Sequence, residues 1–458
     1  MKKIIKTVAS FLFCSMLFAC CQKENTGSTL NSQKNPNRQM EFADDEEFLT
    51  YIQKAHFNYM WEGAEATSGL ACERIHLDNV YPESDSDVIT IGGSGFGVAG
   101  LLVGIDRGFV TREEGCTRLH KIVDYLAKAD RFHGVWPHWL HGKTGTVKPF
   151  GTKDNGGDLV ESSFLMQSLL CVRQYFKDGN ESEKALAEKI NQLWKEMEFS
   201  WYTNGQNVIY WHWSPNYNWE MNFALEGYNE CLITYILAAS SPTHAVDPVV
   251  YHEGWSRNRG GIKSDAVAYG LPLEVKHNGA ESLGGPLFWA HYSYIGLNPN
   301  GLKDDYVDYG VAVKNHALID YNYCVANPKQ HKGYGENCWG LTASYSPGGY
   351  SAHCPGNSDI GVITPTAALS SFPYTPEESM RALKYFYFQK GDRIWGKYGF
   401  YDAFRESDNW TMPRYLAIDQ CTIAPMIENY RTGLLWNLFM SCPEIQEGLS
   451  RLCFTVNQ

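Results

Sequence analysis

Apolar residues recur along the chain with the three-to-four-residue spacing of amphipathic helices, and long alternating strand patterns are rare. Acidic residues at 44–47 mark one helix start, and 111–114 and 375–378 have the pattern of capping boxes. A short strand-like piece is expected at 208–211. Helices are expected at 44–61, 95–108, 111–130, 158–178, 181–201, 226–240, 285–297, 304–326, 362–371, 376–390, 415–440 and 443–452.

About a dozen helices joined by long loops rich in Gly, His and aromatic residues predict an all-α fold. The expected architecture is an (α/α)6 toroid, in which six helical hairpins form inner and outer rings. The more apolar segments 97–105 and 164–172 should lie in the inner ring. The long loops should gather at one end and build the functional site. A helical bundle with an independent cap domain is the alternative.

The N-terminal residues have the pattern of an export signal. A basic start and a short apolar stretch precede Leu17-Phe18-Ala19-Cys20, which resembles a bacterial lipobox. We expect a signal peptide at 1–19, lipidation of Cys20, a polar tether through residue 42 and one folded domain at 43–458. The protein would then be periplasmic or at the cell surface, anchored to the membrane by its lipid. An ordinary signal peptide cleaved elsewhere is the alternative.

Composition narrows the choice of ligand. The net charge is −12 without a basic block, which argues against nucleic acid or another anionic polymer. Of the 13 cysteines, those after Cys21 are scattered singly, and no Cys or His spacing indicates a metal site. Aromatic residues make up 14% of the chain, many on loops where their rings could stack on sugars or simply fill a core. We expect a monomer that binds a neutral ligand and needs no cofactor or metal.

The segment Asp154-Asn155-Gly156-Gly157-Asp158-Leu159-Val160-Glu161 sets three carboxylates within a few residues, directly before an apolar helix. Two carboxyl groups held apart on either side of a bond are what glycoside hydrolysis requires. Asp158 and Glu161 also fit a capping box, which would be a purely structural role. That alternative does not explain Asp154 or the two glycines, which let the backbone approach another group closely.

A second group of acids follows at Glu220, Glu226 and Glu230. If a helix begins near Glu226, Glu226 and Glu230 lie one turn apart, where like charges destabilise a helix slightly. A compensating role in the site is one explanation, and a solvated surface glutamate is the other.

The glycine-rich stretch at 92–97 is interpreted as a tight loop that leads into an inner helix. It follows no strand within a strand–helix–strand unit, so the dinucleotide fingerprint does not apply. Its spacing also differs from that of a nucleophile elbow.

Several motifs together resemble one known family, the glycoamylase-like domain, and more narrowly glycoside hydrolase family 144, the bacterial β-1,2-glucanases. The resemblance covers about residue 45 to the C-terminus. It implies an (α/α)6 toroid and inverting hydrolysis of β-1,2-glucan, cut internally or released as sophorose from a chain end. The motifs are Gly92-Gly93-Ser94-Gly95-Phe96-Gly97, Pro137-His138-Trp139, the acidic segment 154–161, Gly284-Gly285-Pro286-Leu287-Phe288, Cys338-Trp339-Gly340-Leu341-Thr342-Ala343-Ser344 and Ile427-Glu428-Asn429-Tyr430-Arg431-Thr432-Gly433.

The family's acidic cluster corresponds to Asp154, Asp158 and Glu161, with Glu230 opposite. We expect Glu230 to donate the proton and Asp158 to act as base or water-positioning group, with Asp154 and Glu161 tuning the site or binding sugar. Inversion requires the acid and base to be ~6.5–9.5 Å apart. His138 and His353 are interpreted as ligands of sugar hydroxyls or as satisfied core histidines. The expected substrate-binding residues are Phe96, Trp136, His138, Trp139, Trp211, Trp213, Glu220, Glu226, Trp339 and His353.

The sequence is also compatible with three other functions. A glucoamylase-like hydrolase of another glucan would share the site, because the motifs do not fix the linkage. A polysaccharide lyase also uses helical toroids, but it needs cationic groups that the acidic balance disfavours. A non-catalytic glycan-binding lipoprotein would keep the aromatic residues without needing paired acids.

Overall fold

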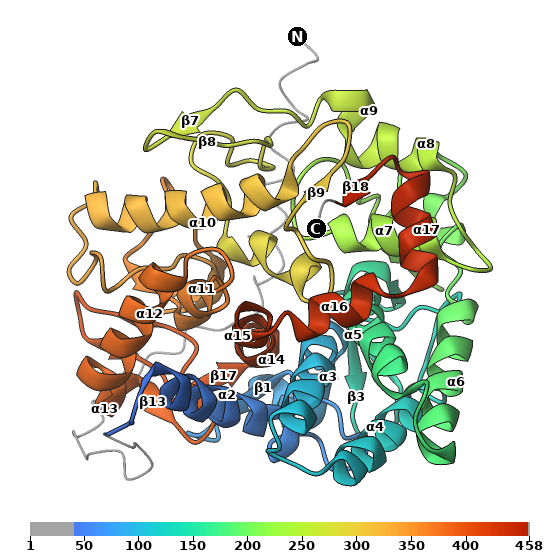
Figure 1. Ribbon diagram of the computed structural model, residues 1–458, viewed down its shortest axis with the longest axis horizontal. Coiled ribbons are helices and arrows are strands. Elements are labelled where there is room, and N and C mark those ends of the chain that lie inside the picture. The colour runs from blue at the N-terminus through green and yellow to red at the C-terminus, as the bar shows by residue number, and fades with distance from the viewer. Residues whose placement is uncertain (1–40, 457–458) are drawn as a thin grey trace.

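The computed structural model describes residues 41–456 of the chain. The predicted signal peptide, the lipidated Cys20 and nearly all of the predicted tether therefore lie outside the described residues. In the described part, helices alternate between an inner and an outer ring around a central axis, which is the predicted (α/α)6 toroid (Figure 1). None of these helices is both long and apolar enough to cross a membrane.

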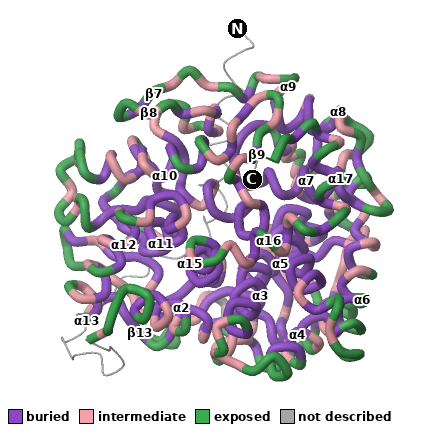
Figure 2. Tube along the Cα trace, in the orientation of Figure 1, coloured by how far each residue is buried: buried purple, intermediate pink, exposed green. Residues whose placement is uncertain are grey.

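The inner ring consists of helices that are buried on nearly every side. α3, α5 and α7 bury almost all their residues, because the outer ring encloses them. Figure 2 shows the result as a buried centre inside a partly exposed rim. The inner positions hold α3 (Ile91–Asp106), α5 (Leu159–Phe176), α7 (Leu232–Ser240), η4 (Leu287–Ala290) with η5 (Tyr292–Tyr294), α11 (Pro365–Leu369), and α14 (Ala417–Gln420) with α15 (Ile423–Arg431).

The outer helices are amphipathic and bury one face against the inner ring, as α4, α6 and α12 illustrate. The final helices α16 (Leu434–Met440) and α17 (Pro443–Arg451) pack on α5 and α7. The outer positions hold α2 (Asp45–Trp61), α4 (Arg112–Leu126), α6 (Glu181–Glu196), α8 (Pro248–Val250) with η3 (Tyr251–Trp255) and α9 (Arg257–Gly260), α10 (Tyr309–Ala326), and α12 (Pro376–Lys384) with η6 (Tyr385–Gln389) and α13 (Gly391–Ile394).

Most expected helices are present, and the exceptions have local causes. The helix expected from 226 begins only at Leu232, because Gly227 has a φ of +78°. The helix expected at 285–297 is reduced to η4 and η5, after Pro286. The helix expected at 415–440 is divided into α14, α15 and α16, and Gly433, with a φ of +70°, lies between the last two.

One predicted capping box is present, whereas a second predicted capping box and the predicted glycine-rich loop are not. The capping box at Thr111 is present, but the one expected at Thr375 is absent, because the Thr375 hydroxyl donates to the Ser371 carbonyl instead. The glycines at 92–97 lie inside α3 and not in a loop before it. A Cβ on Gly95 would lie 2.5 Å from the Leu165 Cα, so the glycine allows α3 to pack closely on α5.

Short antiparallel strands lead into the inner helices. β2, β5, β12 and β17 directly precede α3, α5, α11 and α14. All inner helices run in one direction, so their positive N-terminal ends lie at the same end of the toroid, where carboxylates are favoured. The pairs are β1 (Arg74–His76) with β17 (Arg414–Leu416), β5 (Gly157–Asp158) with β6 (His212–Trp213), β7 (Val267–Ala268) with β8 (Leu271–Pro272), β9 (Leu302–Lys303) with β18 (Thr455–Val456), β10 (Ala343–Ser346) with β11 (Gly349–Ala352), β13 (Trp395–Gly396) with β14 (Gly399–Phe400), and two three-stranded sheets of β2 (Val88–Thr90), β3 (Trp139–His141), β4 (Val147–Lys148) and of β12 (Val362–Ile363), β15 (Phe404–Arg405), β16 (Trp410–Thr411).

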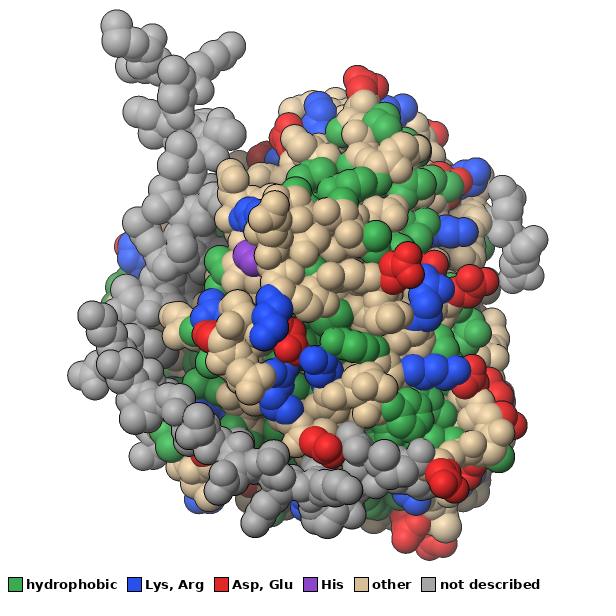
Figure 3. Space-filling model, turned by 90° about the vertical axis from the view of Figure 1, so that its left-hand side faces the viewer, with side chains coloured by type: hydrophobic (Ala, Val, Ile, Leu, Met, Phe, Trp, Pro, Cys, Tyr) green, Lys and Arg blue, Asp and Glu red, His purple; other side chains and the backbone are tan. Residues whose placement is uncertain are grey.

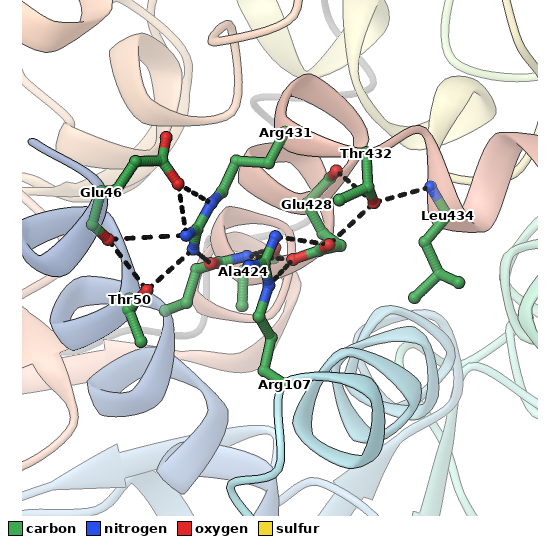
Figure 4. Close-up of polar contacts among 9 residues, drawn as sticks. Glu46, Thr50, Arg107, Ala424, Glu428, Arg431, Thr432 and Leu434 are labelled. Atoms are coloured by element: carbon green, nitrogen blue, oxygen red, sulfur yellow. Dashed lines mark hydrogen bonds and ion pairs between the residues drawn. The ribbon is translucent and has the colours of Figure 1, made fainter.

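At the opposite end, a polar network joins the first and last helices of the ring (Figure 4). The buried Glu428 of α15 accepts two hydrogen bonds from Arg107 at the end of α3, at 2.7 and 2.8 Å, and one from Gln53 of α2 at 2.9 Å. Arg431 in turn donates to Gln53 and to Glu46 of α2. This network closes the toroid and accounts for the motif at 427–433 without a catalytic role.

Acidic and basic side chains are interspersed on the surface. Figure 3 shows one face on which several Lys and Arg side chains gather in a group, with acidic side chains among and around them. The net charge of −12 argues against a polyanionic ligand.

Candidate active site

Asp158 is fully buried at the N-terminus of α5, and both of its carboxylate oxygens are occupied. Oδ1 accepts hydrogen bonds from the Glu161 backbone N–H and the Trp211 indole N–H, each at 2.9 Å. Oδ2 lies 2.9 Å from Nδ1 of His138 and 3.5 Å from Nε2 of His212. Asp158 is therefore both a helix N-cap and the centre of a charged cluster.

The β5–β6 pair brings His212 to the acidic segment. Asp158 lies opposite His212 in the register, so both side chains point to the same face of the ribbon. His212 Nε2 is also 3.2 Å from Oδ2 of the buried Asp154. A Cβ on Gly156 would meet the Trp213 backbone, which explains the glycine at this close approach.

The two histidines carry the positive charge of the cluster. Burial alone would lower the pKa of His138, but the negative charges of Glu161 and Asp158 raise it to about 10. Burial opposes the same effect at His212, whose pKa Asp154 and Asp158 raise to about 9. Burial would also raise the pKa of Asp158, but hydrogen bonds from both histidines hold it well below its usual range.

Glu161 binds the N-terminus of the neighbouring inner helix. Its Oε2 accepts the Gly92 backbone N–H at 2.8 Å, which leaves it outside the expected capping box. The Asp158 N–H donates to the Trp136 carbonyl instead. Burial raises the pKa of Glu161 to about 7, although the positive charge of His138 opposes this shift.

Glu230 lies two residues before α7, close enough to this cluster to respond to its charge. Its side chain is half-buried, and its carbonyl accepts a hydrogen bond from the Ser293 hydroxyl. Burial raises the pKa of Glu230 to about 7, and the negative charge of Asp158 adds to the shift. The structure thus brings all four predicted catalytic acids to one end of the toroid.

A second group of buried acids was missed from the sequence. The Asp419 carboxylate in α14 accepts the Tyr292 hydroxyl at 3.3 Å, and Asp402 accepts the Tyr345 N–H at 2.6 Å. Burial raises the pKa of Asp402 to about 7 and, together with the charge on Asp402, raises that of Asp419 well above its usual value. This carboxyl pair therefore shares a proton near neutral pH.

Glu73 lies between the two acidic groups. It directly precedes β1, and its carbonyl accepts the Ala417 N–H at 3.0 Å, at the start of α14. Burial raises the pKa of Glu73, against the positive charges of Arg74 and His138. No local pattern marks Glu73, Asp402 or Asp419, because long-range packing alone brings them together.

Four of the predicted sugar-binding residues lie in the core, which corrects the sequence-based prediction. Phe96, Trp136, Trp339 and His353 are almost fully buried, so their rings have no free face for a sugar. The Trp136 indole N–H donates to the Leu126 carbonyl. Aromatic residues beside Gly and His indicate loops in sequence, but here they fill the space between the helices.

The other predicted contacts divide between the site and the outer surface. Trp139 packs at the edge of the cluster, with its ring 4.7 Å from Phe150. Trp213 points to the face of β6 opposite His212 and contacts His133. Glu226 is exposed, and the exposed Glu220 pairs with Lys153 at 2.8 Å, outside the acidic cluster.

The cluster also has ligand atoms of the kind that bind metals. His138, Asp154 and Asp158 each offer one, and these atoms lie within 4.8 Å of one another. The sequence showed no such spacing, because His138, just before β3, lies far along the chain from the two acids and meets them only in the fold. His138 and His212 carry positive charge beside these carboxylates and so balance the negative charge that a bound cation would otherwise balance.

Known proteins resemble this chain over almost its whole length. The solved endo-β-1,2-glucanase from Chitinophaga pinensis, in complex with sophorotriose and glucose, is 61% identical, with 90% of this chain and 99% of that chain covered and a TM-score of 0.89. A solved protein from Bacteroides caccae described as a putative glucoamylase is 57% identical, with 90% and 100% covered and a TM-score of 0.88.

A family model and a further relative also match this chain. The glycoamylase family model, described as "Putative glucoamylase", matches residues 222–443. The exo β-1,2-glucooligosaccharide sophorohydrolase (non-reducing end) of Parabacteroides distasonis is 46% identical over 424 residues, which is 89% of this chain. This chain spans 58% of the length of that protein.

Proposed function

This chain belongs to the family of the Chitinophaga pinensis endo-β-1,2-glucanase, and we propose that it is a glycoside hydrolase that cleaves β-1,2-linked glucan with inversion of configuration. The observation that carries this proposal is the relationship between Glu230 and Asp158. One carboxyl is protonated up to about pH 7, and the other is held ionised near it. The ionised Asp158 thus helps to keep Glu230 protonated at neutral pH, and a protonated carboxyl is what the acid step of glycoside cleavage needs.

In this mechanism Glu230 donates its proton to the leaving glycosidic oxygen. A general acid must be protonated at the working pH, and its pKa of about 7 meets that condition. A carboxyl of ordinary pKa would be ionised at neutral pH and would have no proton to give.

Asp158 fits an organising role better than the role of base that the sequence suggested. Its oxygens receive four donors and it is fully buried, so it has no free oxygen for a water molecule. It holds His138, His212 and Trp211 in place and raises the pKa of Glu230.

The other carboxyls of the site that could activate the water are those of Asp154, Glu161, Glu73 and the Asp402–Asp419 pair. Amide variants of each separate them, because the variant that lacks the base loses turnover while it still binds oligosaccharide. Loss of both binding and thermal stability in a variant would indicate a structural role for that residue.

We also propose that the enzyme cuts within the glucan chain. The relative named as an endo-enzyme is more similar, at 61% against 46% for the exo-enzyme, and this chain covers nearly all of it. Internal cleavage would release a ladder of oligosaccharides at early times, whereas sophorose alone would indicate action at a chain end.

A substrate panel tests the proposed function. The protein is incubated with β-1,2-, β-1,3-, β-1,4- and α-1,4-glucans, and the products are separated by size. Selective breakdown of β-1,2-glucan supports the proposal. Dominant activity on starch would contradict the linkage, and binding of glucan without release of reducing ends would contradict catalysis.

We propose a lipid-anchored location on the basis of Leu17-Phe18-Ala19-Cys20 alone. Mass spectrometry of the mature N-terminus tests it: a diacylglycerol-modified Cys20 supports the anchor, and an unmodified N-terminus elsewhere contradicts it. A secreted position would give the enzyme access to glucan outside the cytoplasm.

A further inference from the structure

Residues 251–260, at the rim of the molecule near α9 (Figure 1), combine two uncommon backbone conformations. Tyr251–Trp255 form a π-helical turn. Arg257, Asn258 and Arg259 then have φ angles of 51°, 56° and 61°. Left-handed conformation is unfavourable at each non-glycine residue, and both features concentrate at functional sites. Three such residues in succession therefore call for an explanation.

A buried aromatic network fixes the π-helical turn. The Tyr309 hydroxyl is 3.0 Å from the Tyr251 hydroxyl and accepts the Trp255 indole N–H at 3.0 Å. The Tyr251 hydroxyl also donates to Asp304, and all three aromatic residues are fully buried. The Ser256 hydroxyl accepts the Arg259 N–H at 3.1 Å. These contacts hold the strained turn without using the side chain of Arg257.

The turn places Arg257 against the loop that carries Glu230. Its guanidinium donates to the Asn278 side chain at 2.6 Å, and Asn278 donates to the Glu226 carbonyl at 2.9 Å. It also packs on Gly227, where a Cβ would lie 2.9 Å from the Arg257 Cζ. Gly227 is in the same loop as Glu230, just before α7. A larger residue at 227 would displace the guanidinium.

Arg257 retains most of its hydrogen-bonding capacity. A guanidinium has five N–H donors, and the hydrogen bond to Asn278 uses one of them. Among the described residues, no carboxylate forms an ion pair with this half-buried side chain. A cation held rigidly with free donors is prepared for a ligand rather than for a partner inside the fold.

We propose that Arg257 is a substrate-positioning residue that binds hydroxyl groups of a glucose unit next to the one that is cleaved. This inference rests on the proposed function. The planar guanidinium can donate to two neighbouring hydroxyls of a neutral sugar at once. Because the strained turn fixes the side chain before substrate arrives, less conformational freedom is lost on binding.

Steady-state kinetics on β-1,2-glucooligosaccharides test the proposal with Arg257→Ala, Arg257→Lys and Arg259→Ala. Arg259→Ala is the matched control, because it is in the same turn and its side chain is exposed. Arg257→Ala should raise KM on the order of tenfold or more, with kcat changed by less than about twofold. Arg257→Lys should also raise KM, because lysine keeps the charge but lacks the planar fork. Arg259→Ala should match the wild type.

The outcomes separate this proposal from the proposed function. If the wild type hydrolyses no β-1,2-glucan, the proposed function fails. If it does, and Arg257→Ala keeps the wild-type KM, Arg257 does not position substrate. Should Arg257→Ala fold poorly, Arg257→Gln is titrated with oligosaccharide in the Glu230→Gln background. Unchanged affinity there overturns the proposal, and weakened affinity at unchanged melting temperature supports it.

Discussion

Asp158 and His212 lie directly opposite each other across the β5–β6 pair, with His212 Nε2 3.5 Å from Asp158 and 3.2 Å from Asp154. Together with His138, this arrangement balances two buried carboxylates with two imidazolium groups. Burial raises the pKa of the neighbouring Glu230 and Glu161 to about 7. The negative charge of Asp158 adds to both shifts, and the positive charge of His138 opposes that of Glu161.

Asp158→Asn should remove the carboxylate that keeps His138 and His212 protonated. Without the Asp158 charge, the pKa of His138 should fall from about 10 and that of His212 from about 9. NMR titration of the ring protons measures this. A histidine with a raised pKa stabilises the fold below pH ~6.5, and this contribution disappears as pH rises through the folded value. The variant should therefore lose ~3–5 kcal/mol of stability at pH 7. Unchanged pKa values of both histidines in the variant would contradict the claim that Asp158 raises them.

Glu230→Gln should lower kcat by ~10²- to 10⁴-fold, with oligosaccharide affinity nearly unchanged. The amide keeps the shape of the side chain but has no proton to transfer. Turnover and calorimetric binding measure the two effects separately. The exposed Glu226→Gln is the control and should retain activity. Near-normal turnover in Glu230→Gln would show that Glu230 is not the proton donor.

The pH profile of kcat/KM should show an alkaline limb with an apparent pKa near 7. The raised pKa of Glu230 keeps the acid protonated below about pH 7, and the proton is lost as pH rises through that value. The negative charge of Asp158 contributes to the shift, so the residual activity of Asp158→Asn should decline at lower pH than the wild type. A wild-type limb near pH 4.5 would contradict a buried acid.

Trp139→Ala should destabilise the fold, which differs from the expectation of a purely sugar-stacking residue. Trp139 is 8% exposed and packs against Phe150, with the Arg74 guanidinium 5.5 Å from its ring centre. The expected cost is ~3–5 kcal/mol, measured by denaturant unfolding. Trp201→Ala is the control, because Trp201 is 41% exposed. Weakened binding at unchanged stability would restore the stacking interpretation.

Glu428→Gln should loosen the closure of the toroid at the end opposite the site. It breaks a buried, bidentate ion pair with Arg107, so we expect a loss of ~3–5 kcal/mol with activity retained at low temperature. The exposed Glu181→Gln is the control and should have little effect. Loss of activity without loss of stability would contradict a purely structural role of this network.

The fold class was predictable because helical periodicity and caps are local. The inner helices are apolar on every side, and the capping box at Thr111 is present as expected. Irregular segments were not predictable in the same way. The break before Leu232 depends on the left-handed Gly227, and that conformation serves the packing of Arg257 from a distant segment.

The site was predictable where its residues are close in sequence. Asp154, Asp158 and Glu161 form a compact motif, and the resemblance to a known family added Glu230. Glu73, Asp402, Asp419 and His212 join them only through strand pairing and the closure of the ring. Conversely, Trp136 and Trp339 looked like loop residues, but the spaces between the helices need large side chains to fill them.

The anomeric form of the first product shows whether the enzyme hydrolyses β-1,2-glucan with inversion. Proton NMR spectra are recorded within minutes of adding the enzyme to β-1,2-glucan, before mutarotation equilibrates the new reducing ends. The α-anomer should appear first, because inversion by Glu230 and an activated water changes the configuration of the β-linkage. Early appearance of the β-anomer, or no new reducing ends from β-1,2-glucan, would contradict it.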